Sequence, residues 1–258
     1  SGGKDSADRA RQVAGSYVVS RSFWATFPTA WVPVLGSATI EHAGDGKLIF
    51  NGDLVPNKSP YVEVEPWVWR QVDGAGVIVA QVKDGKVVSL SPGPAYTLLP
   101  TTPVQQALAP VFGICLVLLL VATVAWPVGA LRRRRALTRG REVDAPASWL
   151  TRVARGGGAV ALASQVTWIL VLAVFAAVQS SIVGYGSLAW VVPVVRSAQV
   201  LQALGVVAVI PAAADLVMSL KRQAGWQRVT MSAVLLVTLV ALAWWAWAGN
   251  ALVPRLGL

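Results

Sequence analysis

The chain is poor in the residues that most often carry chemistry. Its 258 residues include one cysteine, Cys115, and one histidine, His42. A single cysteine excludes an intrachain disulfide, and a single histidine excludes a metal site built on two or three imidazoles. Cys115 lies inside a long apolar run and His42 beside a turn. We therefore interpret Cys115 as a small buried apolar side chain and His42 as a surface residue.

Motifs for catalysis are equally scarce. No G-x-S-x-G is present, and a Ser-His-Asp triad would depend on His42 alone. The first four residues, SGGK, match S-x-x-K, but that nucleophile motif opens a buried helix, and residues 1–14 are expected to form a flexible segment. GGG at 156–158 and GYG at 184–186 lack the context of a phosphate loop and are interpreted as a flexible helix entry and an outer turn. The sequence thus predicts no catalytic residue, metal ligand or cofactor.

Charged residues are also few, at 13% of the chain, whereas soluble domains carry about 25%. The apolar excess lies mostly after residue 103, in segments of the roughly 20 residues that cross a bilayer. These observations predict a four-helix transmembrane bundle over residues 105–258, surrounded by lipid bilayer. The expected spans are residues 105–130, 159–182, 197–220 and 229–248.

Basic residues outnumber acidic ones, 22 to 12, and give the chain a net charge of +10. The surplus lies beside the apolar segments instead of on a folded face, which argues against nucleic acid as a partner. By the positive-inside rule, the basic loops 131–158 and 221–228 are cytoplasmic, so the N-terminal domain and the C-terminus are extracytoplasmic. The residues expected to determine this topology are Arg132, Arg133, Arg134, Arg135, Lys221 and Arg222.

Residues 15–91 read as short strands rich in Val, Ile, Tyr and Trp. Asp-Gly steps at 45–46, 73–74 and 84–85 are typical of hairpin turns. Within YVEVE (61–65), valines and glutamates alternate, which predicts a strand with its glutamates on the solvated side. We expect an antiparallel β-meander curled into a small barrel-like domain, followed by a Pro-rich linker over residues 92–104. The fold class is therefore a membrane protein of the α+β type.

Asp215 is the one acidic residue within an expected span, and an intramembrane carboxylate is a functional candidate. It lies about one and a half turns before Lys221 and Arg222, where it can pair with them or reach lipid headgroups. We favour this structural role. Four glutamines in or beside the spans are expected to form hydrogen bonds between helices: Gln165, Gln179, Gln199 and Gln202.

Three stretches carry a family resemblance. RARQVAGSYVVSRS (9–22) resembles the "AGxY" opening of the β-domain that follows the catalytic domain in bacterial β-lactamase-like, penicillin-binding-protein-related serine hydrolases. The stretch beginning YVEVEPWVWRQVDG (61–74) is similar to the continuation in membrane-bound members. The ending WWAWAGNALVPRLGL (244–258) resembles their aromatic tail. The family's catalytic K-T-G and Y-x-N motifs are absent, so no catalytic residue is carried over.

The resemblance implies a bacterial plasma membrane protein whose serine hydrolase domain lies upstream or on another chain. Under this hypothesis the present chain anchors and positions that domain at the outer membrane surface. An export signal would then precede the hydrolase. The alternative is a stand-alone, non-enzymatic membrane subunit whose outer β-domain binds a partner protein or an apolar ligand. A small transporter is less favoured, because four spans with one marginal carboxylate offer little for a substrate path.

Overall fold

A computed structural model describes residues 3–20, 31, 37–51, 59–93, 96–139, 148–179 and 191–253. The chain divides into two compact units, a β unit (residues 1–24 and 31–106) and a membrane unit (residues 25–30 and 107–258). The β unit contains helix α1 (Gly3–Val13) and eight strands: β1 (Gly15–Val19), β2 (Ser37–His42), β3 (Leu48–Asn51), β4 (Tyr61–Glu65), β5 (Val68–Gln71), β6 (Val77–Lys83), β7 (Lys86–Gly93) and β8 (Tyr96–Pro100).

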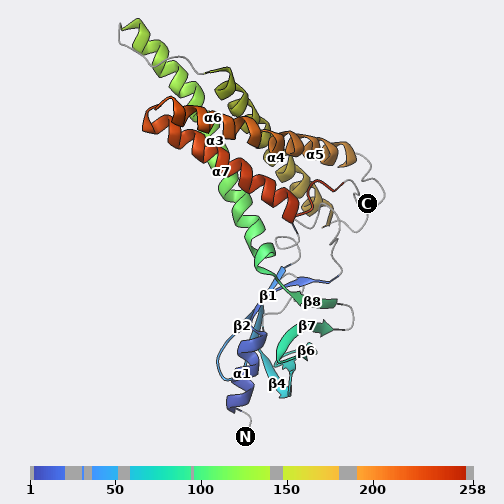
Figure 1. The fold of residues 1–258 in the computed structure, drawn as a ribbon. Helices are drawn as coiled ribbons and strands as arrows, with labels where there is room; N and C mark the ends of the chain where they lie inside the picture. Colours follow the sequence, from blue (N-terminus) through green and yellow to red (C-terminus); the bar gives the residue numbers. More distant parts are fainter. Residues whose placement is uncertain are drawn as a thin grey trace. The chain divides into compact units, whose positions relative to one another are not determined.

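The eight strands form a closed antiparallel barrel in which each strand pairs with its neighbours in sequence and β1 pairs with β8 (Figure 1). The barrel-like meander expected from the sequence is confirmed. Two of its turns follow the Asp-Gly steps, since Asp45, Gly46, Asp84 and Gly85 all have positive φ. Gly accepts this conformation without steric cost, and Asp tolerates it better than most residues.

The eighth strand corrects the expected Pro-rich linker. Residues 96–100 belong to the barrel and pair with β1 at Tyr17, Val18 and Val19. Leu98 is fully buried in the barrel core, and this burial outweighs the extended, solvated conformation that the surrounding prolines favour. Pro100 ends the strand, where the missing N–H disrupts the ladder least.

The N-terminal segment, expected to be flexible, is also different: residues 3–13 form helix α1. Ala10 and Val13 are fully buried against the barrel core, together with Ile40, Phe50 and Trp69. The composition of α1 is polar, so this helix is stabilised by the packing of two apolar residues on one face and not by its own composition. Its second and third turns cover part of the barrel interior.

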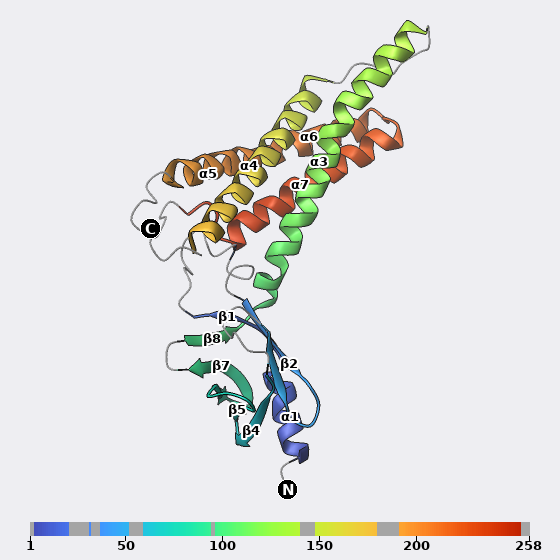
Figure 2. The ribbon, with the colours of Figure 1, turned by 180° about the vertical axis from the view of Figure 1, so that it is seen from behind.

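The membrane unit contains α3 (Pro103–Thr138, with its first turn in the β unit), α4 (Trp149–Gln179), α5 (Val191–Val207), α6 (Val209–Lys221) and α7 (Trp226–Ala248). Among the residues that the structure describes, four helical stretches are long and apolar enough to cross a membrane, so the expected four spans are confirmed. The third span comprises α5 and α6, which are separated at Ala208. Pro211 lacks an N–H for the carbonyl of Val207, and this accounts for the break. Figure 2 shows these helices from the opposite side.

Helix α4 starts ten residues before the second expected span (159–182), and GGG (156–158) lies inside the helix and not at its entry. A Cβ at Gly157 would collide with the Ala208 side chain. A Cβ at Gly158 would lie 2.9 Å from Leu235 Cδ1 and 3.3 Å from Trp126 Cη2. These glycines permit close approach of neighbouring helices, a common use of small residues in membrane bundles.

Candidate functional site

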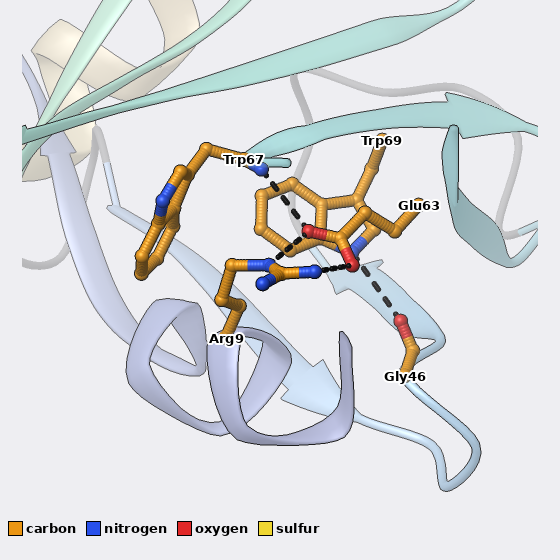
Figure 3. A network of polar contacts seen from close by, with 5 residues as sticks. All are labelled: Arg9, Gly46, Glu63, Trp67 and Trp69. Carbon is orange, nitrogen blue, oxygen red and sulfur yellow. Dashed lines mark hydrogen bonds and ion pairs between the residues drawn. The ribbon is translucent and has the colours of Figure 1, made fainter. Parts of the chain in front are cut away.

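Residues from α1, the β2–β3 turn, β4 and β5 meet where α1 packs on the barrel (Figure 3). We call the group Arg9, Tyr17, Gly46, Glu63 and Trp69 the α1–barrel junction. Arg9 Nε and Nη2 donate to Glu63 Oε1 and Oε2 at 2.6 and 3.0 Å, which makes a bidentate ion pair between α1 and β4. Two parallel charge-assisted bonds fix the orientation of a side chain more strictly than a single bond does.

Glu63 connects three parts of the unit, although its side chain is only 6% exposed. Besides Arg9, its Oε1 accepts the backbone N–H of Trp67 at 3.0 Å. Burial by itself raises the pKa of Glu63, but the hydrogen bonds from Arg9, Ser6 and Trp67 and the charge of Arg9 outweigh it and lower that pKa below 4.5. Trp67 has a φ of +67°, a strained value for a bulky residue, and Glu63 helps to hold it there.

Tyr17, the aromatic residue of the AGSY stretch, faces back toward α1. Its hydroxyl donates to the carbonyl of Val13 at 2.6 Å, which satisfies one of the last carbonyls of the helix. Burial raises the pKa of Tyr17 to about 12, so the hydroxyl remains a donor across the physiological range. Ala14 N–H also bonds Ala10 carbonyl at 2.9 Å. These two hydrogen bonds thus fix the connection between α1 and β1.

Trp69 and Gly46 complete the junction. Trp69 is fully buried, and its Nε1 donates to the carbonyl of Gly46 at 3.3 Å. Ser6 of α1 packs so closely on Gly46 that a Cβ there would overlap its side chain. The β2–β3 turn is therefore held between α1 and a core tryptophan.

Sequence reasoning missed the role of Glu63. The alternation in YVEVE predicts glutamates on the solvated side, yet Tyr61 is buried, Glu63 is nearly so, and Val64 is 53% exposed. The inward face of β4 is the one that includes Tyr61 and Glu63. The available signal was the arginine at position 9, because a buried carboxylate requires a charged partner.

We expect Gly46→Ala to weaken the junction more than Gly85→Ala, which is a matched control. Both glycines have a φ of +73°, but only Gly46 has α1 beside it. An alanine at this left-handed φ costs roughly 1–2 kcal/mol of stability at either position. At Gly46 the added Cβ also meets Ser6 Cβ at 3.0 Å and its backbone carbon at 3.2 Å, for a further cost of roughly 1–2 kcal/mol. Denaturation midpoints of the two variants measure the difference, and equal midpoints would contradict this packing.

Acid should loosen α1 through Glu63. Because the pKa of Glu63 is lowered in the folded chain, its contribution to stability is complete above pH 4.5 and is lost as the pH falls through the folded value. Amide exchange in α1, corrected for intrinsic rates, should rise below about pH 4.5. In Glu63→Gln it should be high already at neutral pH and should not change over that range. Glu65→Gln, at an exposed position of the same strand, is the control and should behave like the original chain.

A second polar group lies inside the membrane unit around Asp215. Its carboxylate is buried and accepts the hydroxyls of Thr151 on α4 at 2.5 Å and of Ser232 on α7 at 2.8 Å. Arg228 Nη2 donates to Thr151 Oγ1 at 3.1 Å, and Ser148 bonds the same oxygen at 2.9 Å. The described hydrogen-bond partners of the Asp215 carboxylate are therefore hydroxyls on other helices. Lys221 and Arg222, which the sequence suggested as partners, are exposed.

The buried glutamines connect helices as expected where the structure describes them. Gln202 Oε1 accepts from Ser164 at 3.0 Å and from Gln165 at 3.3 Å, so α5 is bonded to α4. Gln199 Nε2 donates to the carbonyls of Ala251 and Val253, which follow α7. Nothing is described for the side chain of Gln179. These contacts indicate structural roles.

The other residues singled out in the sequence do not come together in one site. Cys115 is buried in α3, and His42 ends β2 opposite Leu48. Lys4 is exposed in α1, while Ser1 and the loop at 184–186 lie outside the described residues. The residues expected to determine the topology lie at the ends of α3 and α6, where Arg134, Arg135, Lys221 and Arg222 are exposed; the side chains of Arg132 and Arg133 are not among those described. The described residues include no cluster of three His, Cys, Asp or Glu able to hold a metal ion.

No protein-family model, curated protein or solved structure matches this chain. We call Asp215 with Thr151 and Ser232 the Asp215 cluster. Both this cluster and the α1–barrel junction join separate elements through hydrogen bonds. In the Asp215 cluster the hydroxyls of Thr151 and Ser232 donate to the carboxylate, and these contacts join α4, α6 and α7.

Proposed function

We propose that this chain is the membrane-anchoring and β-domain portion of an extracytoplasmic serine hydrolase, related to the β-lactamases and penicillin-binding proteins. The hydrolase domain would precede α1 or be supplied on another chain, and it would perform acyl-enzyme hydrolysis or transfer. The present chain would contribute no catalytic residue. Its task would be to hold that domain at the outer surface of a bacterial plasma membrane.

The observation that carries the proposal is the α1–barrel junction. Two stretches on which the resemblance rests, 9–22 and 61–74, meet there through the Arg9–Glu63 ion pair and the buried Trp69. A helix fixed to a barrel by an ion pair, by a tyrosine hydroxyl and by core packing would hold a preceding domain in a defined position relative to the barrel. A flexible tether would not need these contacts.

The alternative of an apolar ligand within the barrel has less support. In the described part of the barrel, large side chains including Phe50, Tyr61 and Trp69 occupy the interior, and α1 adds Ala10 and Val13. A stand-alone subunit that binds a partner protein remains the competing hypothesis. It differs from the proposal in requiring no serine hydrolase beside the chain.

Labelling of the active serine separates the two functions. Membranes from cells that produce the natural precursor are treated with a fluorescent fluorophosphonate and, separately, a fluorescent β-lactam, and the chain is then purified. We expect a labelled polypeptide that contains this chain or purifies with it. The purified 258-residue chain alone should take up no label and is the control. Absence of any labelled polypeptide with the chain, together with no S-x-x-K and Y-x-N hydrolase encoded upstream, would refute the proposal.

The proposed orientation gives a separate expected result. In a chain with Cys115 replaced by serine, a cysteine at Lys83 in β6 should react with an impermeant maleimide in intact cells. A cysteine at Arg139, just after α3, should react only after the membrane is opened. Both positions are exposed, so access to the reagent depends on the side of the membrane. The reverse pattern would place the β unit in the cytoplasm and would contradict the proposed attachment.

A further inference from the structure

A cleft lies in the β unit at the end of the barrel where α1, β1, β7 and β8 meet. Its volume is about 370 Å³, and small-molecule sites begin at about 300 Å³. The polar side chains of Gln12, Lys86 and Gln106 line it, together with the apolar side chains of Val87 and Pro100. We call it the β7–β8 cleft. All of its lining residues belong to the β unit, so its shape is set within that unit.

The cleft exists because the pairing of β7 with β8 stops before the two strands end. The last described pair on this side is Leu90 with Leu98. Beyond it, β8 continues to Pro100, which pairs with Tyr17 of β1 and has no N–H to donate to β7. On the other side of the gap, Val87 pairs only with β6 in the described sheet. The open end of this ladder therefore leaves room for a ligand beside two strands.

Hydrogen bonds fix the part of the cleft that follows β8. The N–H and Oγ1 of Thr101 both donate to the carbonyl of Ser16, each at 2.9 Å. Gln106 Nε2 in turn donates to Thr101 Oγ1 at 2.8 Å, which orients the amide of Gln106. Its Oε1 accepts no hydrogen bond from a residue that the structure describes, and the side chain of Gln12 on α1 forms none either. Two primary amides therefore offer hydrogen-bonding groups to a ligand.

The cleft is cationic at one edge. Lys86 lines it, and Lys83 lies directly opposite Lys86 across the β6–β7 hairpin. Like charges at directly opposed strand positions repel each other. Among the residues that the structure describes, neither lysine forms an ion pair, and Asp84 in the turn between them is not part of the lining. The described lining contains no Asp or Glu, so an anion bound here meets an ammonium group and no lining carboxylate.

We propose that the β7–β8 cleft binds a short peptide that carries a free carboxylate. Lys86 binds the carboxylate, while the amides of Gln12 and Gln106 bond a peptide group. Val87 and Pro100 contact an apolar side chain of the ligand. A primary amide has a donor and an acceptor, which match the C=O and N–H of a peptide. The cleft is at the small end of ligand-site volumes, which suits about two amino-acid residues.

This proposal rests on the β unit alone and is independent of the hydrolase hypothesis. A phosphate ester is a less favourable ligand, although it is also anionic. Phosphate sites typically use guanidinium forks or several backbone N–H groups at a helix N-terminus. The described lining has no arginine, and Gln12 belongs to the C-terminal end of α1, where the helix dipole is negative. This end opposes a dianion more than a monoanion, so one ammonium with two amides favours a carboxylate.

The test uses the purified full chain in nonionic detergent, with isotopically labelled glycine for nuclear magnetic resonance. Gly15 and Gly85 line the cleft, whereas Gly44 lies between β2 and β3 and is the internal reference. The probes are acetyl-alanyl-alanine, its C-terminal amide and inorganic phosphate. We expect acetyl-alanyl-alanine to shift the amide signals of Gly15 and Gly85 in a saturable manner. The other two probes should leave these signals in place, and Gly44 should not respond to any probe.

Variants of the cleft test the assigned contacts. Lys86→Gln should weaken binding of acetyl-alanyl-alanine about fivefold, as expected for the loss of one exposed charged partner. Lys86→Arg keeps the positive charge and should retain most of the affinity. Gln12→Glu adds a carboxylate to the lining and should weaken binding at least as much as Lys86→Gln. Both positions are exposed, so these variants keep the fold of the barrel.

The matched control is Lys47→Gln. Lys47 is an exposed lysine that follows the Asp45–Gly46 turn, outside the cleft, so its replacement removes the same charge and should leave binding unchanged. Equal weakening by Lys47→Gln would show diffuse attraction and overturn the site. Equal affinity for the peptide amide or for phosphate would show that the carboxylate is not recognised and would overturn the proposal. So would the absence of a saturable shift at Gly15 and Gly85.

Discussion

Replacing Trp69 with alanine is expected to unfold the β unit while the membrane helices stay folded. The Trp69 side chain is fully buried in the barrel core, edge-on to Trp67 with ring centroids 6.4 Å apart. Removing a buried tryptophan side chain leaves a large cavity and costs roughly 3–5 kcal/mol. The lost bond from Nε1 to the Gly46 carbonyl leaves a buried acceptor in addition. The sum approaches the whole stability of a typical domain, roughly 5–15 kcal/mol.

Hydrogen exchange on the full chain in detergent measures this effect unit by unit. In Trp69→Ala, amides throughout the β unit should lose protection, including those of β2 and α1, because these elements share the hydrophobic core that contains Trp69. Amides of α7 serve as the internal reference. Trp69→Phe keeps most of the volume and loses only the hydrogen bond, so its cost should be near 1 kcal/mol. Unchanged protection in the barrel of Trp69→Ala would contradict the central place of this residue.

Replacing Asp215 with alanine is expected to separate the ends of α4, α6 and α7. The carboxylate on α6 is the shared acceptor for Thr151 of α4 and Ser232 of α7. At the N-terminus of α4, Ser148 Oγ accepts the backbone N–H of Thr151, which fixes Thr151 beside the carboxylate. Without the carboxylate, two buried hydroxyls lose their acceptor. Interhelical hydrogen bonds in membranes average less than in soluble proteins, so we expect a loss of about 2 kcal/mol for the group.

The variants Asp215→Asn and Thr238→Val test this assignment. Asparagine keeps one acceptor oxygen and should cost less than alanine. Thr238→Val removes a buried hydroxyl that bonds within its own helix, so it should leave the helix ends together. Amide exchange over residues 148–155 is the measurement. If Asp215→Ala leaves these amides as protected as Thr238→Val does, the cluster does not hold the helices.

The sequence predicts the type of each segment but not the side chains that Glu63 and Asp215 contact. The α1–barrel junction and the Asp215 cluster show why. The sequence singles out Asp215 as an intramembrane carboxylate and suggests Lys221 and Arg222, about one and a half turns later, as its partners. The observed partner Thr151 is 64 positions distant in sequence. Glu63 was assigned to the solvated face because strand alternation is local, whereas its partner Arg9 is 54 positions away.

The same distinction applies to the segment boundaries. GGG (156–158) predicts a helix entry because glycine lowers intrinsic helix propensity. The structure uses it within α4 because Ala208, Leu235 and Trp126 need the space of a missing Cβ. Prolines around residues 92–104 predict a linker. Instead β8 closes the barrel, and the burial of Leu98 in the core stabilises this strand.

By itself, the sequence determined that the chain has a β-rich first part and four membrane-spanning stretches. Hydropathy over about twenty residues and Asp-Gly turn chemistry are properties of short segments, so they act without knowledge of the fold. The tertiary structure decided that α1 is ordered, that an eighth strand closes the barrel and which hydroxyls meet Asp215. These outcomes depend on side chains far apart in sequence, whose burial and hydrogen bonds exist only once the chain has folded.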